Sequence, residues 1–93
     1  MKIDATTTFC LAADCLATHV DDEMILMSLK GGVYLGLDRM ASKIAERLSS
    51  PVSFGDLVLG LRRDFDAPPQ VIENETREFL QQLLHHQVIE TRG

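Results

Sequence analysis

Basic residues are scarce in this chain. Lysine and arginine together number 9 against 14 aspartate and glutamate residues, so the formal net charge is −5 at pH 7. A chain with this balance has no overall attraction for the phosphates of nucleic acids or for an anionic membrane surface. We therefore expect neither nucleic acid nor a membrane among its partners.

Long apolar runs are also missing. No stretch approaches the roughly 20 apolar residues that cross a bilayer, and the first residues do not join a basic segment to an apolar one as a secretion signal does. The sequence therefore predicts a cytoplasmic protein. Its 93 residues suffice for one domain with its own core, but they leave little room for a deep, enclosed active site.

Groups that carry out catalysis or bind metals are few and poorly spaced. The two cysteines, Cys10 and Cys15, match neither a metal-ligand pair nor a redox Cys-x-x-Cys motif. His85 and His86 are adjacent, so on a helix they point about 100° apart, which is poor geometry for binding one metal ion. We expect two buried free thiols, no metal, no cofactor and no catalytic residue, and hence no enzyme. A thiol-dependent enzyme that pairs either cysteine with His19 is a less favoured alternative, because no diagnostic spacing supports it.

Two strands joined by a glycine turn form the centre of the predicted structure. Residues 24–29 are a nearly continuous apolar run of strand length, Lys30-Gly31-Gly32 supplies turn chemistry, and the strand pattern returns over Val33–Leu37. Leu16, Thr18 and Val20 alternate with Ala17 and His19, which indicates an earlier strand. Together these segments predict a sheet of three short antiparallel strands, which still needs helices on one face.

Three helices follow the predicted sheet. The first covers residues 39–48 behind Asp38, which is a suitable N-cap. The second begins after Ser53, with Asp56 three residues on in an arrangement like a capping box. The third runs over residues 69–86, and its proline suits the first helical turn.

The two ends of the chain give weaker signals. Residues 1–8 are polar and rich in threonine, which is typical of a frayed end or a weak edge strand. Val88 and Ile89 predict an apolar clamp or a short strand. The order of the elements, a three-stranded antiparallel sheet followed by three helices, defines an α+β, winged-helix-like fold, and residues 1–93 form a single domain.

The predicted hairpin and the start of the first helix carry a family resemblance. An acidic residue, an apolar strand, a glycine turn, the sequence Val-Tyr-Leu-Gly-Leu-Asp and a helix that begins Arg-Met-Ala-Ser-Lys-Ile together resemble the pyrroloquinoline-quinone chaperone D (PqqD) family. This family, with the leader-binding proteins of split lasso-peptide systems, is known as RiPP recognition elements, where a RiPP is a ribosomally made, post-translationally modified peptide. The resemblance extends from about Leu16 onward.

The resemblance implies a specific function. Members of the family bind the leader segment of a precursor peptide as an added strand against the third strand and the third helix, and they present it to a modifying enzyme. Here that enzyme would be a separate chain. A cysteine protease of a lasso-peptide system is favoured over a radical enzyme of a quinone-cofactor system, because little sequence lies beyond the recognition domain.

The resemblance also implies which residues bind the peptide. The matching positions are Val33, Tyr34, Leu35, Gly36, Leu37, Glu75, Thr76, Glu78, Phe79, Gln82 and Leu83. Two positions depart from the family pattern. Asp38 stands where asparagine is frequent, which changes little because both are good N-caps. Glu75-Thr76 stands where an Asp-Val pair is common, which leaves the chemistry of the groove less defined.

The residues by themselves leave two interpretations open for each half of this site. On the third helix, the polar members of the set could rim a groove whose floor is Thr76, Phe79 and Leu83, or the acidic ones could simply form the solvated face and complement the helix dipole. The strand Val33–Leu37 could be an open edge that accepts a guest strand. Alternatively, it could be short, twisted or covered by Val88-Ile89. The resemblance favours the guest strand.

A winged-helix DNA-binding regulator is the alternative function. Affinity for DNA comes largely from lysine and arginine on phosphates, whereas the third helix carries Arg77 among three glutamates. The first two helices do have some positive charge, which leaves an unusual docking mode open; its residues are Arg39, Lys43, Arg47, Arg62 and Arg63.

Overall fold

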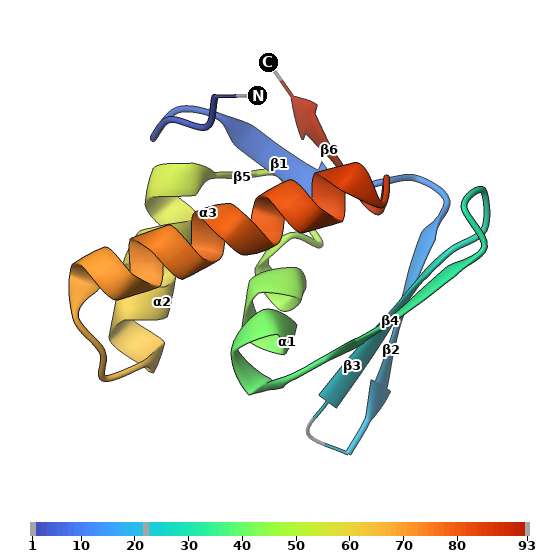
Figure 1. Cartoon of the computed structure of the whole chain (residues 1–93), viewed down its shortest axis with the longest axis horizontal. Helices are drawn as coiled ribbons and strands as arrows, with labels where there is room; N and C mark the ends of the chain where they lie inside the picture. Colours follow the sequence, from blue (N-terminus) through green and yellow to red (C-terminus); the bar gives the residue numbers. More distant parts are fainter. Residues whose placement is uncertain (1, 22, 93) are drawn as a thin grey trace.

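The computed structural model describes residues 2–21 and 23–92; Met1, Asp22 and Gly93 lie outside the described residues. Figure 1 shows the elements, which in chain order are β1 (Thr8–Leu11), β2 (Cys15–Val20), β3 (Glu23–Ser28), β4 (Val33–Leu37), α1 (Arg39–Arg47), β5 (Val52–Ser53), α2 (Phe54–Asp64), α3 (Pro69–His85) and β6 (Ile89–Arg92).

The predicted sheet is present as β2, β3 and β4, which pair antiparallel in that order. Alternation along β3 buries Met24, Leu26 and Ser28 and leaves the residues between them more exposed. The three predicted helices are present within one residue of their expected ends. The α+β, winged-helix-like class is thus confirmed.

A second sheet, in the order β5-β1-β6, was not predicted. Thr8 pairs with Arg92 and Leu11 with Ile89, so the two ends of the chain lie side by side. The expectation of a frayed end or edge strand over residues 1–8 was wrong for its last residue, because Thr8 begins a strand that is central in this sheet. Of the two options for Val88-Ile89, the short strand is the one observed, beginning at Ile89.

The helices contact both sheets, α1 at β3 and β4, α2 at β5 and α3 at β6. Helix α3 runs across α1 and α2, while β2, β3 and β4 project to one side (Figure 1). The core draws fully buried side chains from every layer; the largest are Phe9, Leu26, Ile44, Leu48, Leu57, Leu61, Ile72, Leu80 and Leu83. None of the helices in residues 2–21 and 23–92 combines the length and apolar character needed to span a membrane.

An ion pair joins α1 to α2. The guanidinium of Arg47 donates to the carboxylate of Asp64 at 2.8 Å, and this hydrogen bond lowers the pKa of Asp64. Gly60 makes room for it, because a Cβ there would lie 2.5 Å from the guanidinium carbon. Glycine has a low helix propensity and weakens α2, but at position 60 it leaves space for the ion pair that joins α1 to α2.

Replacing Asp64 by asparagine tests this ion pair. The carboxyl has a lower pKa in the folded chain than its value of about 3.9 in the unfolded chain, so the pair stabilises the fold above that pH. Its contribution is lost as the pH falls through the folded pKa. We expect Asp64→Asn to lower the free energy of unfolding at neutral pH, and the difference from the wild type to close in strong acid.

Urea unfolding at a series of pH values measures this difference. Asp66→Asn is the matched control, because among the described residues the Asp66 carboxylate has no ion-pair partner. A difference between Asp64→Asn and the wild type that stays constant with pH would show that charge is not what the carboxylate contributes.

Candidate functional site

Strand β4 is an open edge of its sheet. It pairs with β3 in a register that sets Leu35 opposite Leu26 and Val33 opposite Ser28, and in the described part of the chain no strand lies on its other side. The segment that was a candidate to cover it does not do so, because β6 pairs with β1. Half of the backbone donors and acceptors of β4 are therefore left without a ladder partner.

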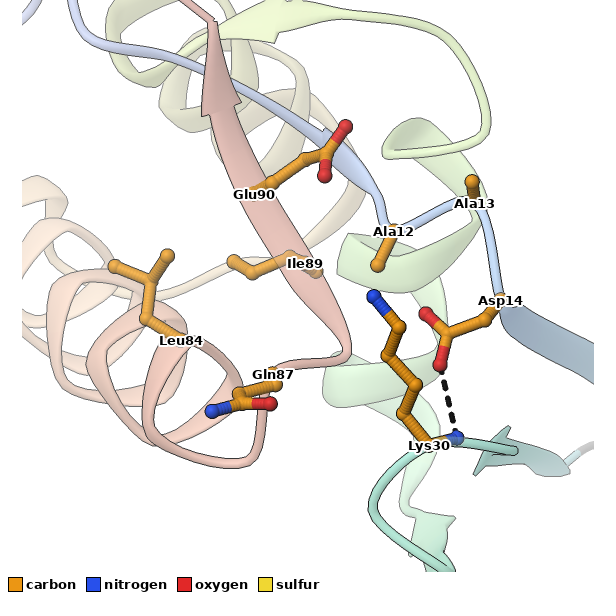
Figure 2. Close-up of a pocket in the computed structure, with 8 residues that line it drawn as sticks. All are labelled: Ala12, Ala13, Asp14, Lys30, Leu84, Gln87, Ile89 and Glu90. Atoms are coloured by element: carbon orange, nitrogen blue, oxygen red, sulfur yellow. Dashed lines mark hydrogen bonds between the residues drawn. The ribbon is translucent and has the colours of Figure 1, made fainter.

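The turn that leads into β4 is fixed by its neighbours. Gly32 has φ of +62°, a conformation that glycine adopts without strain, and its N–H donates to the carbonyl of Ser28 at 2.9 Å. The carboxylate of Asp14 accepts from the N–H of Lys30 at 2.9 Å, as Figure 2 shows. The hairpin is thus tied to the segment that joins β1 to β2.

A buried hydroxyl holds the other end of β4. The Oγ of Ser42 accepts from the N–H of Met24 at 3.1 Å and donates to the carbonyl of Leu37 at 3.1 Å. Immediately beside it, the carboxylate of Asp38 accepts from the N–H of Ala41 and caps α1, as predicted. The transition from strand to helix is therefore anchored in both elements.

One face of α3 lies opposite this strand. At its C-terminal end the carbonyl of His86 is 3.8 Å from the place where a Cβ of Gly31 would be, so the helix cap lies close to the hairpin turn. Eleven residues earlier, Glu75 lies on the same face. This span of helix is about 16 Å long and β4 is about 17 Å long. The edge of β4 and this face of α3 therefore flank one elongated area, here named the β4–α3 surface.

A pocket of about 130 Å³ opens at the end of this surface where β4 passes into α1. Its lining combines Phe79 with apolar residues of α1 and with two acidic residues. The residues that line it are Asp38, Met40, Ala41, Ile44, Glu75 and Phe79. It has the size for one side chain of a bound peptide.

The residues expected to bind a peptide lie at different depths. Those from β4 are exposed or half-buried except Leu37, with Tyr34 75% exposed. On α3, Glu75, Glu78 and Gln82 are exposed and Phe79 is half-buried. Thr76 and Leu83, expected in the floor, have no exposed area. The hydroxyl of Thr76 donates to the carbonyl of Ile72 at 2.6 Å, so both residues support the surface from beneath.

Sequence reasoning missed the contribution of α1 to the pocket. Met40, Ala41 and Ile44 recur at helical spacing within the predicted first helix, as the apolar stripe of an amphipathic helix does. Periodicity marks which side of a helix faces the protein, but it does not tell whether neighbouring elements cover that side completely. The position of these residues just after the edge strand was the available signal.

Thiol chemistry finds no support in the geometry. Cys10 is buried as expected, with its Sγ 3.2 Å from the Nε of Arg92, whereas Cys15 is only half-buried. Burial and the charge of Asp14 raise the pKa of the Cys15 thiol, which keeps it protonated and weakly nucleophilic. His19 lies four residues further along β2, about 13 Å away. A catalytic pair of Cys15 and His19 is therefore not formed.

Another pocket, of about 500 Å³, lies beside the hairpin turn. Figure 2 shows Lys30, Asp14 and Glu90 around it, with Leu84 and Ile89 on the side of α3 and β6. Neither histidine nor cysteine lines it. Among the residues described, no group of three or more histidine, cysteine or acidic side chains is placed to hold a metal ion.

These features define a small α+β domain whose open sheet edge runs beside a helix, and the comparisons agree with that class. The model of the family described as coenzyme PQQ synthesis protein D (PqqD) matches residues 23–89, from the start of β3 to the start of β6. The chain belongs to the PqqD family. No curated protein matches it.

Two solved structures resemble the chain over most of its length. One is described as TbiB1 in complex with the TbiA(beta) leader peptide; it is 26% identical, with 87% of this chain and 94% of that one covered and a TM-score of 0.81. The other is described as lasso peptide synthetase B1 complexed with the leader peptide; it is 21% identical, with 88% and 96% covered and a TM-score of 0.76. The second likeness shows the fold alone.

Replacing Ser42 by alanine tests the anchor at the end of β4. The change leaves the N–H of Met24 and the carbonyl of Leu37 without their partner in a buried place, which we expect to lower the free energy of unfolding by about 1 to 3 kcal/mol. Ser49→Ala is the control, because its hydroxyl donates to the carbonyl of Glu46 at an exposed position. Equal losses in the two variants, measured by urea unfolding, would contradict the role of Ser42.

Proposed function

We propose that this chain binds the leader segment of a ribosomally made precursor peptide as an added strand on β4 and presents it to a separate modifying enzyme, without catalysing a reaction itself. The observation that carries the proposal is the open edge of β4 beside α3. Membership of the PqqD family and the likeness to a TbiB1 complex with a leader peptide support it.

Strand addition would use both parts of the β4–α3 surface. Backbone hydrogen bonds to the free edge of β4 give affinity for any extended peptide, and alternate side chains of that peptide turn toward Val33, Leu35 and α3. One of them would fill the pocket beside Phe79. Because Asp38 and Glu75 line this pocket together with apolar residues, a side chain with an apolar stem and a terminal amine, guanidinium or hydroxyl fits best.

The benefit of such binding is a higher local concentration of substrate. A precursor held by its leader keeps its remaining segment near any enzyme that also contacts this chain. Since one of the two solved structures with this fold is described as lasso peptide synthetase B1 complexed with the leader peptide, we favour a cysteine protease that removes the leader, acting in the cytoplasm. A radical enzyme of quinone-cofactor synthesis is the other partner that the family suggests.

Binding of DNA through α3 is less well supported. The guanidinium of Arg77 lies 3.6 Å from the carboxylate of Glu73 and 4.9 Å from the centre of the Phe54 ring, so it already has partners. Glu75 and Glu78 are exposed beside it. Phosphates brought against this helix would meet carboxylates first.

A titration of the labelled amide spectrum tests the proposal. Synthetic leader segments of precursors encoded near this chain's own gene are added to the protein. We expect the shifts to concentrate in Val33–Leu37 and in α3 from Glu75 onward, because those amides border the added strand. If no leader moves these amides while a DNA duplex perturbs the helices, the proposal fails and the winged-helix regulator replaces it.

The ring of Phe79 gives a second prediction. Phe79→Ala removes the largest apolar wall of the pocket, so we expect leader affinity to fall about tenfold or more. Fluorescence anisotropy with a labelled leader measures it, at a temperature where circular dichroism shows the variant folded. Val71→Ala is the control, because Val71 is an exposed apolar residue of the same helix outside the pocket. Equal affinity of Phe79→Ala and the wild type would remove the pocket from the binding site.

A further inference from the structure

The sheet of β2, β3 and β4 has a second apolar face. Side chains that alternate with the buried ones of β3 point away from the core, and their directly paired neighbours point the same way. Met27 lies opposite Leu16 and Tyr34, and Ile25 lies opposite Thr18 and Gly36. With Val20 and its paired residue Glu23, these positions form a surface here named the outer face; its apolar members are Leu16, Val20, Ile25, Met27 and Tyr34.

This surface is incompletely covered. Leu16 and Val20 are each 50% exposed and Tyr34 is 75% exposed. The central residues Ile25 and Met27 are half-buried although they lie on the middle strand. The helices pack on the opposite side, where Met24, Leu26 and Leu37 join the core. Contiguous apolar surface of this kind typically marks a site of interaction with another protein.

A second copy of this chain suits the outer face poorly. Each copy has a net charge of −5, and the charged residue of the outer face, Glu23, is acidic. Asp14 and Asp21 stand at the two ends of β2, so antiparallel pairing of two β2 edges would bring Asp14 of one copy beside Asp21 of the other. Like charges placed opposite each other are unfavourable. The charge pattern instead favours a partner with an apolar centre and lysine or arginine at its rim.

The position of the outer face favours the modifying enzyme as that partner. This step rests on the function proposed above. A guest strand added to β4 becomes the fourth strand of the sheet, so every second guest side chain emerges on the outer face next to Tyr34 and Gly36. A protein that covers this face would therefore contact the chain and its bound leader together.

We infer that the outer face of the β2–β3–β4 sheet is the docking surface for the modifying enzyme, which binds it through an apolar patch rimmed by basic side chains and senses the bound leader at the β4 side. The leader and the enzyme thus use different parts of one sheet. Substitutions on β2 should separate the two interactions.

The test uses the double variant Leu16→Thr/Val20→Thr. Threonine keeps the preference for strand, and both positions lie two strands away from the guest edge. We expect leader affinity, measured by anisotropy, to stay within about twofold, and the affinity of the leader-loaded chain for a candidate cysteine protease encoded near its gene to fall about tenfold or more. The double variant Leu59→Gln/Val71→Gln, which changes exposed apolar residues of α2 and α3, should keep wild-type affinity for both.

Charge reversal supplies a second measurement. Glu23→Lys should also weaken binding of the protease, and the loss should shrink as salt is added, because exposed charges are screened. Leader affinity should again be unchanged. A variant that binds the protease as tightly as the wild type at low salt would contradict the basic rim.

The remaining outcomes are distinguishable. If Leu16→Thr/Val20→Thr binds both leader and protease like the wild type, the docking surface is wrong and the proposed function stands. If the wild type binds no leader, anisotropy shows that failure before the protease is added. If sedimentation shows that the wild type is a dimer and the double variant a monomer, a second copy covers the outer face and the inference is overturned.

Discussion

Strand β4 lacks half of its backbone partners, and the surrounding structure compensates for that deficit. An edge strand is stable only where its side chains and its ends are held, because one row of hydrogen bonds is missing. Here Leu37 is buried in the core, the hydroxyl of Ser42 bridges the end of the ladder, and Asp14 holds the turn. An edge fixed in this way keeps its free donors and acceptors in the extended geometry that a guest strand requires.

The short linker between β1 and β2, residues 12–14, positions both sides of the β4–α3 surface. The N–H of Ala12 donates to the carbonyl of Val88 at 2.9 Å, which ties the linker to the chain directly after α3. Two residues later, Asp14 accepts from the turn that begins β4. The second sheet, which pairs β1 with β6, thus has a consequence at the site. It fixes the end of α3 relative to the edge that α3 accompanies.

Locally encoded features of this arrangement could be predicted from the sequence. The hairpin follows from alternation and a glycine turn, and α1 and α2 follow from apolar periodicity behind Asp38 and Ser53. The second sheet could not be predicted in the same way, because Leu11 pairs with Ile89 across most of the chain and β5 has only two residues. Such short strands carry almost no periodic signal, and their pairing depends on packing elsewhere.

The burial of each site residue could not be predicted from the sequence for a related reason. Thr76 and Phe79 both lie toward the protein in the pattern of α3, yet the first is fully buried and the second borders a pocket. The difference in burial between Thr76 and Phe79 depends on the position of α1, whose residues line the pocket beside Phe79. The periodicity of a helix contains no information on the position of a neighbouring helix. The alternation of β4 is more informative, because it assigns Val33 and Leu35 to one face and Tyr34 to the other without reference to any neighbour. A single strand thereby presents a backbone edge, a core-side face and an outer face, so one small sheet offers separate surfaces for the peptide and for the enzyme that we propose as its partners.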